Sequence, residues 1–153
     1  MIHPNLKEYL PSYYFSTINP HAAYPKLEGR LKTETCVIGG GLTGLCTALP
    51  LAENGHEVIV LEAARVGFGA SGRSGGQVIS DYACGMEEIE KQVGLEQARW
   101  FWQQSLQAVE LVDERVRKHH IDCDWQRGYA TVAIRKQHWK ELRQWHEHAQ
   151  KHY

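Results

Sequence analysis

Short apolar runs and one longer amphipathic stretch divide the first half of the chain into expected elements. Residues 34–38 and 58–61 are compact apolar runs typical of buried strands, and residues 42–54 carry apolar positions at helical spacing. Gly55 is expected to end that helix. Pro50 is expected to kink it, because proline lacks the N–H that a helix interior needs. The pattern predicts a strand–helix–strand unit.

The second half of the chain has mostly helical periodicity. Helices are expected at 86–93, 95–120 and 136–153, with short strands at 121–125 and 129–134. The long helix carries an apolar stripe that is expected to face a core: Ala98, Phe101, Trp102, Ser105, Ala108, Val109, Val112 and Val116. Three side chains of the last helix are also expected to face inward: Trp139, Leu142 and Trp145.

This pattern predicts three parts. Residues 1–32 are rich in aromatic residues and proline without a sustained period, and are expected to be an ordered arm that packs over another part. Residues 33–80 hold the strand–helix–strand unit and a glycine-rich loop, and residues 81–153 are expected to begin a further domain. Because a doubly wound sheet needs more than two strands, we expect the N-terminal part of a larger enzyme.

Charge and cysteine content narrow the function classes. The chain has 17 Lys and Arg against 18 Asp and Glu, which are interleaved, so neither a nucleic-acid nor a membrane surface is expected. No apolar run is long enough for a membrane helix. Four cysteines lack CxxC spacing and two lie in elements expected to be buried, which favours reduced thiols and a cytoplasmic location: Cys36, Cys46, Cys84 and Cys123. His148 and His152 share a helix face, but no metal site is expected because no cysteine or carboxylate triad accompanies them.

Three glycines follow the first expected strand at the spacing of a dinucleotide-binding turn. Gly39 permits a tight turn, Gly41 lets the backbone approach a pyrophosphate, and Gly44 allows close packing of helix on strand. The phosphates are expected at the helix N-terminus, where unpaired N–H groups and the helix dipole favour an anion. Glu62, after the second strand, can accept both hydroxyls of an adenosine ribose and would repel a 2′-phosphate. The expected ligand is therefore FAD or NAD, and not NADP.

A second glycine-rich loop follows Glu62, with the sequence EAARVGFGASGRSGGQ over residues 62–77. Such a loop is unfavourable to order unless a ligand or partner holds it. It resembles the flavin loop of the FAD-dependent amine and D-amino-acid oxidase family. Residues 12–14 and 121–124 are similar to the members that oxidise gamma-glutamylputrescine, and the resemblance spans residues 12–150.

The resemblance implies an α/β fold: a Rossmann-like FAD-binding domain followed by the start of an α+β substrate domain. It implies FAD as cofactor, with the ADP end at the first glycine turn and the ribityl-flavin end along residues 70–77. Arg65 or Arg73 can pair with phosphate and Ser71 and Ser74 can donate to it, while glycines 69, 72, 75 and 76 let the chain run flat against the cofactor. The expected cofactor-binding set is Gly39, Gly41, Thr43, Gly44, Glu62, Ala63, Arg65, Ala70, Ser71, Arg73, Ser74, Gly75, Gly76 and Gln77.

The implied reaction oxidises a C–N bond of an amine or amino acid to an imine, with gamma-glutamylputrescine as the expected substrate and molecular oxygen as the acceptor. The flavin carries out the redox chemistry, so no catalytic residue is assigned in this segment. Two alternatives remain. An NAD-binding dehydrogenase domain explains the first glycine motif but not the second loop, and the 153-residue chain by itself is expected to be an inactive flavin-binding fragment.

Overall fold

The computed structural model describes residues 12–19 and 24–153. The chain forms two compact units, Met1–Gly76 and Gln77–Tyr153, and each is described by itself. The expected arm, residues 1–32, belongs to the first unit, and its residues 1–11 and 20–23 fall outside the described part. The expected division at residues 32 and 80 stays a prediction.

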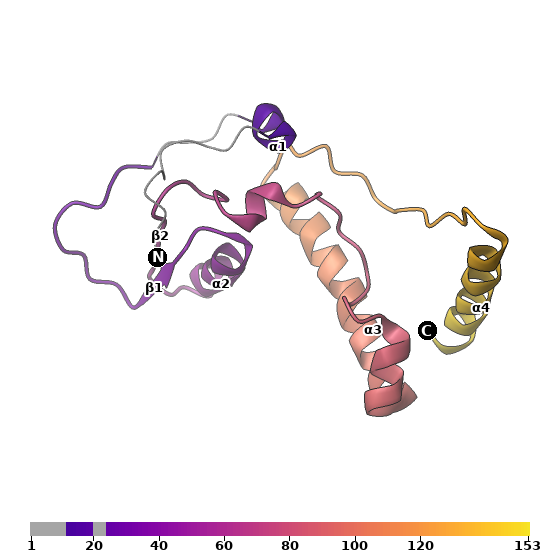
Figure 1. The fold of residues 1–153 in the computed structure, drawn as a ribbon. Helices are drawn as coiled ribbons and strands as arrows, with labels where there is room; N and C mark the ends of the chain where they lie inside the picture. The colour runs from indigo at the N-terminus through magenta and orange to yellow at the C-terminus, as the bar shows by residue number, and fades with distance from the viewer. Residues whose placement is uncertain (1–11, 20–23) are drawn as a thin grey trace. The chain divides into compact units, whose positions relative to one another are not determined.

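A strand–helix–strand unit forms the centre of the first unit. Strand β1 spans Thr35–Ile38, helix α2 spans Leu42–Glu53 and strand β2 spans Val58–Leu61 (Figure 1). The two strands are parallel, with Thr35 opposite Val58 and Ile38 opposite Leu61. Helix α2 contacts both strands, as expected for a crossover helix that covers one face of a parallel sheet. This arrangement confirms a mixed fold with a small parallel sheet.

Helix α2 ends just before Gly55 and contains Pro50. Gly55 has a φ of +87°, which favours glycine, and its N–H donates to the Ala52 carbonyl at 3.0 Å. Helix α2 runs through Pro50 as one element. The Pro50 carbonyl accepts from both the backbone N–H and the side-chain amide of Asn54, at 3.0 and 2.8 Å. The proline therefore does not divide the helix.

The described part of the arm contains a short helix, α1, over Tyr13–Thr17. The Ser12 hydroxyl caps it by accepting from the Phe15 N–H at 3.2 Å. Helix α1 contacts the 3₁₀ turn η1, Ala70–Arg73, which lies in the second glycine-rich loop. This helix therefore packs over another part of the chain, as expected of the arm.

The second unit contains helix α3, Met86–Lys118, and helix α4, Lys136–His152 (Figure 1). Gly94 has non-helical dihedral angles within α3, with a φ of +79°. This break confirms the expected pair of helices on either side of Gly94. No helix in the described ranges is both long enough and apolar enough to cross a bilayer.

The strands expected at 121–125 and 129–134 are wrong, because the structure has no strand in either range. A strand is stable only where a neighbouring strand pairs with its N–H and C=O groups. No described residue of this unit belongs to a strand that could pair with them. Val132 and Ile134 consequently remain 75% and 85% exposed.

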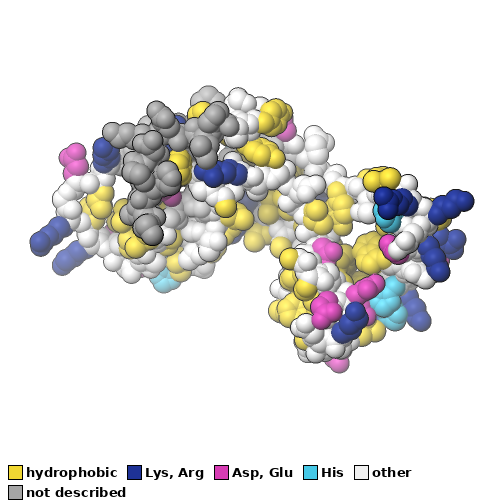
Figure 2. Space-filling view, viewed as in Figure 1, with side chains coloured by type: hydrophobic (Ala, Val, Ile, Leu, Met, Phe, Trp, Pro, Cys, Tyr) yellow, Lys and Arg dark blue, Asp and Glu magenta, His cyan; other side chains and the backbone are white. Residues whose placement is uncertain are grey.

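Several apolar side chains are more exposed than their sequence pattern predicts, and Figure 2 shows hydrophobic side chains on the visible face. Trp139 and Trp145 are 58% and 40% exposed, so the expectation that they face inward is wrong. Cys36 and Cys46 are also exposed. Burial alternates along β1, and Cys36 lies at one of its exposed positions. In the long helix, Ala98 and Ser105 are buried while Ala108 is exposed.

Candidate cofactor site

The turn after β1 requires glycine at residue 39. Gly39 has a φ of +105°, a conformation that side chains strongly disfavour. Its N–H donates to the Leu61 carbonyl at 2.7 Å, so the pairing of β1 with β2 extends into the turn. The chain therefore reverses directly above the ends of both strands, where the expected site lies.

Gly44 lets α2 approach this turn closely. A Cβ atom at residue 44 would lie 1.9 Å from the Gly39 carbonyl oxygen and 3.4 Å from the Val37 side chain. Such a separation from a backbone atom is far below van der Waals contact. The close helix-to-strand packing expected for this glycine is therefore present.

The N-terminus of α2 offers hydrogen-bond donors to an anion. Gly41 is the N-cap residue and supplies no side-chain cap. The Leu42 N–H donates to the Ser71 Oγ at 2.8 Å, whereas the N–H groups of Thr43 and Gly44 have no partner among the described residues. These two free donors lie at the positive end of the helix dipole, so this end of α2 fits a phosphate group.

The Glu62 carboxylate lies against the glycine turn. Its Oε2 atom accepts from the Gly40 N–H at 2.7 Å, and its Oε1 atom accepts from the Ala64 N–H at 2.9 Å. An ionised carboxylate has about four acceptor positions. Two therefore remain for the ribose hydroxyls expected at Glu62, and the backbone bonds hold the carboxylate in place.

Gly40 is a residue of the site to which the sequence pattern assigned no role. It is buried, its N–H donates to Glu62, and its carbonyl accepts from the Gly67 N–H at 2.9 Å. A Cβ atom there would lie 3.3 Å from the Glu62 Cβ and 3.4 Å from the Val66 side chain. The run of three consecutive glycines is the signal that could have identified it.

The second glycine-rich loop folds tightly on itself. A Cβ atom at Gly72 would lie 2.2 Å from the Gly67 carbonyl oxygen, and Gly67 has a φ of +74°. We expected Gly72 to let the chain lie flat against the cofactor, but its contact with Gly67 is what requires a glycine there. Gly69 and Gly75 have open space around the position of a Cβ atom.

The structure gathers part of the expected cofactor-binding set at one place. Gly39, Gly41, Thr43 and Gly44 lie at the turn or at the N-terminus of α2. Glu62 and Ser71 form hydrogen bonds to the backbone there. Thr43 and Ser71 are exposed, and so are the other expected residues of the first unit: Ala63, Arg65, Ala70, Arg73, Ser74, Gly75 and Gly76. Arg73 makes a long hydrogen bond, 3.5 Å, to the Phe68 carbonyl. Gln77 is the first residue of the second unit.

A charged cluster in the second unit attaches the segment after α3 to that helix. Arg127 donates to the Asp113 carboxylate at 2.6 and 3.0 Å and also pairs with Glu110, while Arg117 pairs with Asp113 one helical turn away. Asp113 is 3% exposed. Burial opposes its ionisation, but the hydrogen bonds from Arg127 and the charges of both arginines lower its pKa overall. This cluster is structural, because its polar atoms are used within it.

A second polar cluster joins α3 and α4. The Glu90 Oε1 atom lies 2.7 Å from the His148 Nε2 atom and accepts from the Tyr153 hydroxyl at 2.5 Å. The His148 and His152 rings are 4.5 Å apart, which agrees with their expected place on one helix face. Burial opposes ionisation of Glu90, but these hydrogen bonds and the histidine charges lower its pKa overall.

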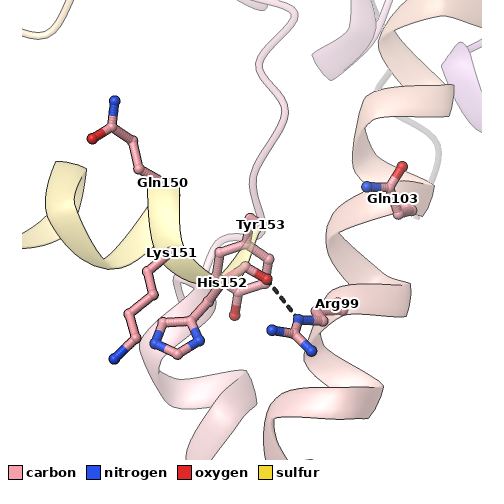
Figure 3. A pocket seen from close by; sticks show the side chains of 6 residues that line it. All are labelled: Arg99, Gln103, Gln150, Lys151, His152 and Tyr153. Carbon is pink, nitrogen blue, oxygen red and sulfur yellow. Dashed lines mark hydrogen bonds between the residues drawn. The ribbon is translucent and has the colours of Figure 1, made fainter.

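A hollow in the second unit lies beside this cluster. It has a volume of about 540 Å³ and is lined by Arg99, Gln103, Gln150, Lys151, His152 and Tyr153 (Figure 3). The Arg99 Nε atom donates to the His152 carbonyl at 2.6 Å, across the hollow's wall. None of the expected cofactor-binding residues lines it. The candidate site is therefore the glycine turn of the first unit.

Comparison with known proteins assigns the family. A model of the FAD dependent oxidoreductase family (DAO) matches residues 34–153, which is most of the chain. The chain belongs to this family. The family is FAD-dependent, so the resemblance inferred from the two glycine-rich segments and the expectation of FAD are both confirmed. Membership implies a Rossmann-like fold around the parallel pair β1 and β2.

Individual relatives match over their own N-terminal parts. A probable oxidoreductase, OrdL, of Haemophilus influenzae is 48% identical over 136 residues, which is 89% of this chain and 32% of that protein. Gamma-glutamylputrescine oxidoreductase of Escherichia coli is 42% identical over 129 residues, 84% of this chain and 30% of that protein. The chain thus spans about a third of the length of these relatives. No solved structure matches it.

Proposed function

We propose that this chain forms the ADP-binding part of an FAD-dependent oxidoreductase that oxidises a C–N bond of an amine. The observation that carries the proposal is the glycine turn, where two free N–H groups of α2 and the Glu62 carboxylate lie beside the same backbone reversal. A diphosphate and a ribose need these two kinds of group at neighbouring positions. Family membership supports FAD as the nucleotide.

The proposed roles divide between the two glycine-rich segments. The N–H groups of Thr43 and Gly44 bind the diphosphate, and Glu62 accepts hydrogen bonds from the adenosine ribose. Residues 70–77 lie along the ribityl chain and flavin, and Arg65 or Arg73 pairs with phosphate. When bound, FAD supplies the electron acceptor for oxidation of the C–N bond. No side chain of this segment is given a proton-transfer role.

Gamma-glutamylputrescine is the proposed substrate, and molecular oxygen is the proposed acceptor. The name of the Escherichia coli relative supports the substrate, and its 42% identity extends over most of this chain. About two thirds of each relative lies outside the matched segment. We therefore place the substrate-binding residues mainly in a downstream region, with residues 81–153 as the start of the α+β substrate domain. We expect the 153-residue chain alone to show no turnover.

Two measurements test this function. The purified chain is titrated with FAD and followed by the flavin absorption and fluorescence, and saturable binding is expected. A chimera then joins this chain to the downstream two thirds of the Escherichia coli relative, and peroxide is measured with gamma-glutamylputrescine. We expect the chimera to contain flavin and to be active, and the isolated chain to be inactive. A folded chimera without flavin would refute the cofactor assignment, and turnover by the isolated chain would refute the downstream placement of the substrate site.

A further inference from the structure

Helix α3 is interrupted at Gly94. The backbone there has a φ of +79° and a ψ of 163°, far from helical values, and it separates two helical segments, 86–93 and 95–118. A Cβ atom at Gly94 would meet nothing within 4 Å, so the dihedral angles and not the surrounding space favour glycine. Hinges in proteins are residues of this kind that absorb changes of φ and ψ. The angle between the two segments is therefore free to change unless another part of the chain fixes it.

Residues 148–153, which we call the α4 end, contact α3 before this break. The Glu90 side chain is 19% exposed. Its Oε1 atom lies 2.7 Å from the His148 Nε2 atom and accepts from the Tyr153 hydroxyl at 2.5 Å. Burial and the hydrogen bond to Glu90 raise the pKa of the Tyr153 hydroxyl, so this group remains a donor at neutral pH. One carboxylate oxygen of the shorter segment thus receives two contacts from the α4 end.

The α4 end also contacts α3 after the break. The Arg99 Nε atom donates to the His152 carbonyl at 2.6 Å (Figure 3). The centroids of the Tyr153 and Trp102 rings lie 5.5 Å apart. Tyr153 therefore reaches both segments, with its hydroxyl on Glu90 and its ring on Trp102. These contacts fix the two segments of α3 relative to each other.

We infer that the α4 end is a pH-sensitive clamp across the Gly94 break, held closed by the Glu90 carboxylate and opened by acid. A protonated Glu90 no longer attracts His148 by charge, and it accepts more weakly from Tyr153. The contacts after the break do not involve this carboxylate, so the α4 end stays on the longer segment while the shorter one turns about Gly94. The clamp lies wholly in the second unit and is independent of the proposed cofactor function.

The direction of the pH effect follows from the groups around Glu90. Burial opposes its ionisation, but hydrogen bonds from Tyr153 and His148 and the charges of His148 and His152 lower its pKa below the usual value of 4.5. A carboxyl group with a lowered folded-state pKa stabilises the fold above its unfolded pKa, and this contribution is lost as the pH falls through the folded value. The clamp should therefore be closed at neutral pH and open below about pH 4.

Other titratable and charged side chains face this cluster from both helices. They are Glu87, Lys91 and Arg99 on α3, and His148, Lys151, His152 and Tyr153 at the α4 end. Burial and the charges of His148, Lys151 and Arg99 lower the pKa of His152, so its protonation is also unfavourable there. The experiment must therefore separate Glu90 from His152.

The test measures the distance across the break by double electron–electron resonance. Spin labels are attached in Glu88→Cys and Gln107→Cys, at exposed positions on either side of the break, after the four exposed cysteines are changed to serine. The otherwise wild-type chain should give one narrow distance distribution at neutral pH and a broad one below about pH 4. Glu90→Gln, which is neutral at every pH, should give the broad distribution throughout and lose the acid step.

Further variants test the two donors of the clamp. Tyr153→Phe keeps the ring but removes the hydroxyl, and His148→Gln removes the charge, so each should broaden the distribution at neutral pH. Their controls, Tyr129→Phe and His146→Gln, change exposed residues of the same types and should leave it narrow. His152→Gln should keep the acid step, because the carbonyl of this residue, and not its ring, contacts the longer segment.

Other outcomes would overturn the inference. A narrow distribution in Glu90→Gln at neutral pH would show that the carboxylate does not hold the clamp, and an acid step that persists in this variant would assign the step to another group. Loss of the step in His152→Gln would assign it to that ring. The ¹³C resonance of the Glu90 carboxyl group is a second readout that needs no Glu90 variant. It should titrate over the pH range in which the distance changes, and a distance change in a different range would contradict the inference.

Discussion

The Glu62 Oε2 atom accepts a hydrogen bond from the N–H of Gly40 at 2.7 Å, beside the end of both parallel strands. Gly40 is buried, so its N–H has no access to water if this acceptor is removed. The carboxylate therefore stabilises the turn as well as offering acceptors to a ribose. Stability and nucleotide binding are coupled at this one side chain.

Replacing Glu62 by glutamine should lower the free energy of unfolding. The variant keeps one acceptor oxygen but turns an amide group towards a second backbone N–H, which leaves one donor unsatisfied. The expected loss is about 1–3 kcal/mol, measured by urea denaturation. Glu57→Gln, a change at an exposed side chain, is the matched control and should have a small effect. Unchanged stability of Glu62→Gln would contradict the role of the Gly40 bond.

Replacing Gly44 by alanine should prevent α2 from packing on the turn. The added Cβ would lie 1.9 Å from the Gly39 carbonyl oxygen, and a backbone atom cannot move aside as a flexible side chain can. We expect a loss of at least about 3 kcal/mol, the upper end for overpacking. Gly69→Ala is the control, since its Cβ would meet nothing within 4 Å. Circular dichroism melting curves compare the two, and similar melting temperatures would rule out the steric argument.

The sequence predicted the elements whose stability is local or whose glycines have a fixed geometric role. The parallel strands, α2, the break at Gly94 and α4 were all expected, because periodicity and glycine position determine them. The strands expected at 121–125 and 129–134 were wrong, since a strand depends on a neighbour that periodicity does not reveal. The same reason explains the exposed Trp139 and Trp145: an amphipathic pattern predicts an apolar face but not its partner.

The candidate site shows a similar division. The positions of Gly39, Gly44 and Glu62 followed from motif spacing, because each contact is made within a strand–helix–strand unit of fixed geometry. The hydrogen bond between Ser71 and Leu42 spans 29 residues and depends on how the second loop folds, which spacing alone does not determine. Gly72 was assigned to the cofactor on composition, although its contact with Gly67 requires the glycine.

Acid should release the segment that Arg127 attaches to α3. Hydrogen bonds from Arg127 and the charges of Arg117 and Arg127 outweigh the burial of Asp113 and lower its pKa below the usual value of 3.8. A carboxyl group with a lowered folded-state pKa stabilises the fold above its unfolded pKa, and this contribution is lost as the pH falls through the folded value. We therefore expect the fluorescence of nearby Trp125 to change below about pH 4.

Substitution separates this transition from general acid unfolding. Asp113→Asn should show the released state of the Arg127 segment already at neutral pH and lose the step below about pH 4. Glu114→Gln, an exposed neighbour on the same helix, should keep the wild-type profile. An acid transition of Trp125 that is identical in wild type and Asp113→Asn would show that Asp113 does not control it.

The nucleotide preference should follow the charge of Glu62. Its carboxylate accepts hydrogen bonds from the 2′- and 3′-hydroxyls of a ribose but repels a 2′-phosphate. Two like charges about 4 Å apart at an effective dielectric constant of about 20 repel by about 4 kcal/mol, which is roughly a thousandfold in affinity. Calorimetric titration of the chain should therefore rank FAD above NAD and show no binding of NADP. Glu62→Gln should narrow the gap between NAD and NADP, because it removes the repulsive charge. Wild-type binding of NADP as tight as that of FAD would show that Glu62 does not lie against the ribose.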